Sequence, residues 1–205
     1  MRRSTLFGLF GIVALLLSLT AAHSAAQQEP AFKLETGWLP EHEAFLIWYA
    51  KQKGWDKQEG LDIVLNRFDS GKELIRNADK WAIGACGAFP ILTSPHPERF
   101  TIIGVGNDES LANVVMVRPD SPILNTKGAN KGYPNLYGKA DDIRGKTIIC
   151  PASSSAQYLL TKWLAAYGLT AGDVRINNTD AAPGLQAFLG GEGDAIVLWA
   201  PYSTM

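Results

Sequence analysis

Apolar residues recur at intervals of three and four positions over residues 155–167, which places them on one face of a helix. The apolar, β-rich stretch before this helix, residues 146–150, predicts a strand. Three consecutive serines, Ser153, Ser154 and Ser155, lie between the two segments. The pattern therefore predicts a strand that turns into an amphipathic helix through a run of hydroxyl side chains.

The same alternation of strand and helix patterns extends along most of the chain. It predicts an α/β fold with mainly parallel sheets flanked by helices. A Pro- and Gly-rich stretch, 119–144, interrupts the alternation and divides the chain into two lobes near residue 118. The strands are expected at 32–37, 61–67, 81–85, 101–105, 112–117, 146–150, 173–177 and 194–199, and the helices at 40–53, 71–79, 88–93, 155–167 and 181–189.

The segments just beyond the predicted strands are rich in Gly, Ser and aromatic residues. In open α/β sheets, ligands bind outside the carboxyl ends of the strands. Small residues let a ligand approach backbone N–H groups, whereas aromatic residues form walls. Turns and caps also use Gly and Ser, and a single such loop needs no further explanation. Because five loops share this composition, we expect a ligand pocket where they meet.

The serine run has two interpretations. Serine is a favoured N-cap, because its oxygen accepts a hydrogen bond from a free N–H group of the first helical turn. Three hydroxyls beside the positive end of a helix also suit an acidic ligand group.

A second helix start, Ser70 followed three residues later by Glu73, has the spacing of a capping box.

The N-terminus has the pattern of a secretory signal peptide. Arg2 and Arg3 precede an uncharged apolar stretch, 6–19, and small residues follow it up to Ala26. We therefore expect residues 1–26 to be removed and the protein to be periplasmic. The net charge of −1 gives no indication of a nucleic-acid or anionic-membrane partner.

Cysteine and histidine are scarce in this chain. The two cysteines, Cys86 and Cys150, do not form a disulfide framework, and we expect both to be free thiols. After signal removal only His42 and His96 remain, without the spacing of metal ligands. The sequence therefore predicts neither a metal site nor a cofactor.

Several separated motifs resemble one protein family. These motifs are WLPEHEAFLIWYAKQKGWDKQEGLDI, FDSGKELI, WAIGACGAFP, IIGVGNDES, MVRPDSPI and GEGDAIVLWAPY. Through them the chain resembles, over 32–202, periplasmic substrate-binding proteins of ABC importers. The group is that of nitrate, sulfonate, taurine and bicarbonate, which is related to thiamine-precursor binding proteins.

The resemblance implies a type II clamshell, with lobe I at 30–118 and lobe II at 119–205. It also implies that lobe I is completed by a segment beyond residue 205, so that the chain is expected to be truncated. A small acid or zwitterion would bind between the lobes and pass to an ABC permease of the inner membrane, and the complete protein would be a monomer. The ligand-binding residues would be Trp38, Pro40, Ser70, Gly71, Gly87, Ala88, Ser153, Ser154, Ser155 and Trp199.

The charges near the expected cleft favour a zwitterion or a neutral solute over a bare inorganic anion. Glu41 and Glu43 lie close to it, and Lys72 is the one obvious nearby cation. Alternatively, the side chains of both glutamates face solvent on the first turn of a helix. An enzyme on the same fold is the alternative function, similar to desulfinases, with Cys86 as nucleophile and His42 as its base.

Overall fold

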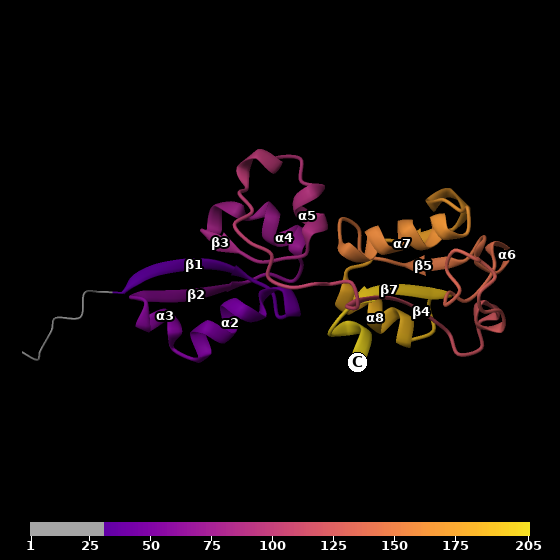
Figure 1. The fold of residues 1–205 in the computed structure, drawn as a ribbon, viewed down its shortest axis with the longest axis horizontal. Coiled ribbons are helices and arrows are strands. Elements are labelled where there is room, and N and C mark those ends of the chain that lie inside the picture. The colour runs from indigo at the N-terminus through magenta and orange to yellow at the C-terminus, as the bar shows by residue number, and fades with distance from the viewer. Residues whose placement is uncertain (1–30) are drawn as a thin grey trace, which may run out of the picture.

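The computed structural model describes residues 31–205, which form two α/β lobes side by side (Figure 1). The predicted signal peptide lies outside the described residues. Each lobe has a twisted sheet with helices on both faces, as the alternating strand and helix patterns predict. In residues 31–205, no helix is both long and apolar enough to span a membrane.

The sheet of lobe I is parallel, with strand order β2-β1-β3. Its first strand pairs with the second over its whole length, from Phe32 opposite Leu61 to Trp38 opposite Arg67. Helices α2 and α3 cover one face, whereas α4 and α5 lie toward the other (Figure 1). The elements of this lobe are β1 Phe32–Trp38, α2 Phe45–Gln52, α3 Trp55–Gln58, β2 Leu61–Arg67, α4 Gly71–Arg76, β3 Ile83–Gly84 and α5 Ala88–Leu92.

The sheet of lobe II is mixed, with strand order β4-β7-β5-β6. Its last three strands in that order are parallel, whereas β4 is antiparallel to β7. Helix α7 lies on one face and α8 on the other (Figure 1). The elements of this lobe are β4 Asn113–Val117, α6 Ala140–Ile143, β5 Thr147–Ile149, α7 Ser155–Ala166, β6 Arg175–Asn177, α8 Ala181–Leu189 and β7 Ala195–Trp199.

Short 3-10 helices lie in the connections between these elements. One of them, His42–Ala44, precedes α2, so the α-helix begins at Phe45 rather than near Pro40 as the sequence predicts. The others are Ala78–Lys80, Pro97–Arg99, Pro122–Asn125, Ala171–Asp173 and Tyr202–Thr204.

The two lobes differ in the size of their apolar cores. The core of lobe II is continuous, because every residue of β7 is buried between α7 and α8. The core of lobe I is smaller and consists of Leu39, Ala44, Phe68, Leu74 and Ile75 with partly buried neighbours. Burial of apolar area is the main favourable term in folding, so lobe II has the larger hydrophobic contribution.

Two predicted strands differ from the structure. Residues 101–105 form no strand, and Ile103 and Val105 are 79% and 90% exposed. The segment is rich in β-branched apolar residues, but no neighbouring strand within residues 31–205 pairs with it. Residues 113–117 do form a strand, yet it belongs to the sheet of lobe II. The chain therefore enters lobe II before Asn113 and not at residue 118.

The core of lobe II should be sensitive to truncation of α7. Leu160 is 1% exposed in this core, so Leu160→Ala should lower the free energy of unfolding by about 2–5 kcal/mol. Leu189→Ala in α8 is the matched control, because Leu189 is 64% exposed and its truncation should change stability by less than about 0.5 kcal/mol. Chemical denaturation followed by circular dichroism measures both variants. Equal effects of the two changes would contradict this packing.

Candidate ligand-binding site

A cleft lies between the lobes. Both lobes contribute loops that follow the carboxyl ends of their strands, as expected for an open α/β sheet. Lobe I contributes Leu39, Glu41, Glu43, Ser70, Gly71, Lys72, Gly87 and Pro90, and lobe II contributes Pro151, Ala152, Ser153, Ser154, Ser155, Asp180, Ala181 and Trp199.

Ser154 is the N-cap of α7. Its hydroxyl accepts a hydrogen bond from the N–H of Gln157 at 3.3 Å and donates one to the carbonyl of Pro151 at 2.6 Å. The residue is 8% exposed, so both roles of its hydroxyl are satisfied inside the protein. For this serine the capping interpretation holds, and its side chain has little left to offer a ligand.

The other two serines have different partners. Ser155 donates its hydroxyl to Oδ1 of Asn113 at 2.9 Å, which connects the start of α7 to the start of β4. Ser153 has a left-handed backbone, with φ of 56°, and its N–H donates to Oε1 of Gln157 at 2.6 Å. The hydroxyl of Ser153 forms no hydrogen bond with any residue in 31–205 and lines the cleft. Ser153 is therefore the serine available to a ligand.

The facing wall of lobe I begins at Ser70. This serine caps α4 by accepting a hydrogen bond from the N–H of Glu73 at 3.2 Å. The Glu73 carboxylate accepts from the N–H of Asp69 at 2.9 Å, so the reciprocal bond of the predicted capping box reaches one residue further back. A Cβ at Gly71 would lie 2.9 Å from Cγ of Pro90, so glycine is required for the close approach of α4 and α5.

Two carboxyl groups are buried at the base of the lobe I wall. Glu41 is 8% and Glu43 is 7% exposed, so the alternative that they face solvent is wrong. Burial, reinforced by the charge of Glu43, raises the pKa of Glu41 to about 8. Burial also raises the pKa of Glu43. Among the described residues that line the cleft, Lys72 is the one cationic side chain.

Of the remaining residues predicted for the site, some line the cleft and others lie outside it. Trp199 lines the cleft at the end of β7. Trp38 and Pro40 instead line a neighbouring groove, together with aromatic residues of α2. Ala88 is exposed at the start of α5 and lines neither space.

The sequence did not indicate Glu109, which lies beside the cleft. A Cβ added at Gly87 would lie 3.3 Å from one carboxylate oxygen of Glu109 and 3.7 Å from one of Glu43. The two acids come from segments far apart in the chain, and no spacing rule connects them. Glu109 occurs in IIGVGNDES, one of the motifs on which the resemblance rests, but nothing in that motif shows where its carboxylate lies.

The thiol of Cys86 is poorly suited to nucleophilic chemistry. Burial, and then the charges of Glu43, Glu109 and Glu41, raise its pKa to about 12. A catalytic cysteine needs the opposite, a lowered pKa that maintains the thiolate. The neighbouring acids therefore argue against the alternative of an enzyme with Cys86 as its nucleophile.

Comparison with known proteins gives one relative by sequence and several by structure. No family model matches the chain. It is 27% identical over 190 residues to a Brachyspira hyodysenteriae protein named "Putative ABC transporter periplasmic binding protein", covering 92% of this chain and 55% of that protein. The chain thus spans about half the length of the curated relative that it matches.

Two solved structures have the same arrangement of elements. The aliphatic sulphonate binding protein SsuA of Escherichia coli superposes with a TM-score of 0.64 at 21% identity, covering 84% of this chain and 56% of that one. The alkanesulfonate-binding protein SsuA of Xanthomonas axonopodis pv. citri, bound to MOPS, gives a TM-score of 0.64 at 22% identity, covering 86% and 57%.

The chain has the fold of a type II periplasmic binding protein. The predicted α/β clamshell is therefore confirmed, and so is the resemblance on which it was based. In this fold the cleft between the lobes is the natural place for a ligand, because the strand ends of both sheets face it.

The two cysteines should react slowly in the folded protein. Both are free thiols, and burial raises the pKa of each to about 12. A higher pKa leaves less thiolate at pH 8, so Ellman's reagent should react at least about a hundredfold more slowly with native than with unfolded protein. Stopped-flow absorbance measures both rates. Fast reaction in the native state, or fewer than two thiols after unfolding without a reductant, would contradict this.

Proposed function

We propose that the chain is the solute-binding part of an ABC import system and that it captures a small organic acid or zwitterion between its lobes. The observation that carries this proposal is the cleft itself, formed by strand-end loops of both lobes, with the unused hydroxyl of Ser153 on one wall. The similarity to periplasmic binding proteins supports the same function.

The charges of the cleft narrow the ligand class. The dipole at the start of α7 favours an acidic group near Ser153. The buried carboxyl groups of Glu41 and Glu43 on the facing wall suit a ligand whose second part donates hydrogen bonds or is positively charged. A bare inorganic anion such as nitrate has no such part. A sulfonate with a polar or cationic second end suits both walls, and the two SsuA proteins are named for sulfonate binding.

This function also implies a location and a partner. The protein would act in the periplasm, exported by the signal peptide predicted at residues 1–26, and would deliver its ligand to a permease of the inner membrane. It would act as a monomer. A binding protein returns its ligand unchanged, which distinguishes this proposal from the desulfinase-like enzyme.

A panel of small acids tests the proposal. Taurine, isethionate, ethanesulfonate, nitrate and bicarbonate are titrated calorimetrically into the protein, and thermal shifts are recorded in parallel. We expect at least one organic sulfonate to bind saturably at one site per chain and to raise the melting temperature, and to be recovered unchanged. Release of sulfite, or binding of nitrate and bicarbonate but no organic acid, would contradict it.

The serines provide a matched pair of variants for the ligand identified in that panel. Ser153→Ala should weaken binding by about tenfold or more, because a hydrogen bond to a charged group contributes roughly 1.5–3 kcal/mol. Ser154→Ala should instead lower stability by about 0.5–2 kcal/mol through loss of the cap and leave affinity nearly unchanged. Calorimetry and thermal melts measure both quantities. The reverse pattern would show that Ser153 does not contact the ligand.

A further inference from the structure

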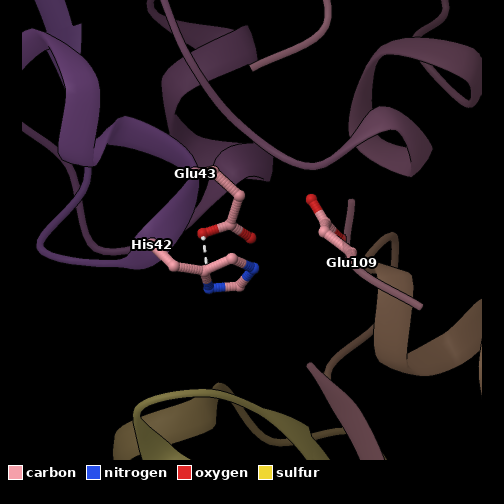
Figure 2. Close-up of side chains that lie close together, drawn as sticks. All are labelled: His42, Glu43 and Glu109. Carbon is pink, nitrogen blue, oxygen red and sulfur yellow. Dashed lines mark ion pairs between the residues drawn. The ribbon is translucent and has the colours of Figure 1, made fainter. Parts of the chain in front are cut away.

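One cluster of side chains beside the cleft has the composition of a metal site. His42, Glu43 and Glu109 each offer one ligand atom, and these atoms all lie within 4.8 Å of one another. Figure 2 shows the imidazole and the two carboxylates converging from different parts of the chain. His42 and Glu43 lie in the 3-10 helix after β1, whereas Glu109 lies in the segment that leads into lobe II.

The hydrogen bonding of His42 leaves one ring nitrogen available. Its Nδ1 lies 3.1 Å from the carbonyl oxygen of Ala200, which can only accept a hydrogen bond. Nδ1 therefore carries the proton of the neutral ring, and Nε2 keeps a lone pair. That Nε2 is buried and has no hydrogen-bond partner within residues 31–205. A histidine that ligates a metal typically has this arrangement, with its other nitrogen donating to a backbone carbonyl or a carboxylate.

Glu43 provides a second, independent indication. Its side chain is 5% exposed, and its Oε2 is buried without a hydrogen-bond partner among the described residues, although it lies 3.4 Å from Nδ1 of His42. Oε1 of the neighbouring Glu41 is unpartnered in the same way. A buried polar atom without a partner carries a desolvation cost that a bound cation would offset.

The charge around the cluster is unbalanced. Glu41, Glu43 and Glu109 lie close enough to interact electrostatically, and none of them forms an ion pair with a Lys or Arg of residues 31–205. Carboxylates in one buried site repel one another, and the repulsion is relieved when one of them is protonated or when a cation lies between them. A divalent cation bound between His42, Glu43 and Glu109 would supply that positive charge.

We propose that His42, through Nε2, together with Glu43 and Glu109 forms a binding site for a divalent transition-metal ion, with Zn²⁺ as the best match. One imidazole nitrogen and two carboxylates are borderline ligands that suit Zn²⁺, whereas Mg²⁺ and Ca²⁺ prefer oxygen alone. Three protein ligands leave one tetrahedral position open. Because Glu43 also lines the cleft, the metal site would lie beside the space for the organic ligand.

The test uses the whole chain, stripped with EDTA and dialysed, and ZnCl₂ as the probe. Calorimetry and elemental analysis after gel filtration should find one Zn²⁺ per chain, and Zn²⁺ should raise the melting temperature. His42→Ala, Glu43→Gln and Glu109→Gln should each weaken Zn²⁺ binding by at least about tenfold, since loss of even a supporting partner of a metal ligand costs that much. MgCl₂ should bind much more weakly than ZnCl₂.

The second histidine of residues 31–205 provides the matched control. His96 lies 3.3 Å from Glu98, and both side chains are exposed. His96→Ala and Glu98→Gln should therefore leave Zn²⁺ binding unchanged. Absence of Zn²⁺ binding, or binding that survives the cluster variants but is lost in the His96 variant, would overturn the proposal. Melting curves in EDTA establish that each variant is folded, and Glu109→Gln, at a half-buried position, tests the site if His42→Ala does not fold.

The result is independent of the proposed transport function. Zn²⁺ binding is measured without any organic ligand, and the panel of small acids can be titrated in EDTA. A chain that binds a sulfonate in EDTA but never Zn²⁺ would overturn the metal site alone. A chain that binds Zn²⁺ but no organic acid would support the metal site and contradict the function.

Discussion

The geometry of the cleft depends on the antiparallel pairing of β4 with β7. This pairing places Asn113 opposite Trp199, and the N–H of Ala200 donates to the carbonyl of Ala112 at 3.0 Å. The start of one strand and the end of the other therefore lie together at the junction of the lobes. Asn113 holds Ser155 from there, and the carbonyl of Ala200 lies beside Nδ1 of His42. A single strand pair thus positions groups on both walls of the cleft.

The lobe I wall contains buried acids that do not stabilise the folded chain. Burial raises the pKa of Glu41 and of Glu43, which means that the charged forms are less favourable in the folded state than in the unfolded one. Binding sites commonly have groups with perturbed pKa values, because arrangements that suit a ligand seldom suit the empty protein. Burial, and then the charges of Glu43, Glu109 and Glu41, also raise the pKa of the neighbouring Cys86 thiol. The acids thus add to an effect of burial that makes cysteine chemistry unfavourable.

Local sequence patterns correctly predicted α7 and β7, which belong to the buried core of lobe II. They failed for segments whose structure depends on pairing with a strand that is distant in the sequence. The apolar stripe of α7 and the continuous apolar run of β7 needed no tertiary information, because a stripe marks one buried face and an unbroken run marks a strand buried on both faces. Residues 101–105 are rich in β-branched apolar side chains, but a strand also needs a neighbouring strand to satisfy its backbone groups. The sequence of β4 likewise does not show whether its partner lies in lobe I or lobe II, which is why the predicted boundary was displaced.

The run of three serines shows the same limit at the level of single side chains. Ser154 acts through atoms at most three residues away, and such capping can be predicted from spacing. Ser155 depends on an asparagine that lies 42 positions earlier in the chain, and no local rule identifies it. Ser153 is distinguished by the lack of a partner for its hydroxyl and by a left-handed backbone that non-glycine residues seldom adopt. Three adjacent residues of one type thus have three different environments, because each environment is determined by the strands and helices packed around it.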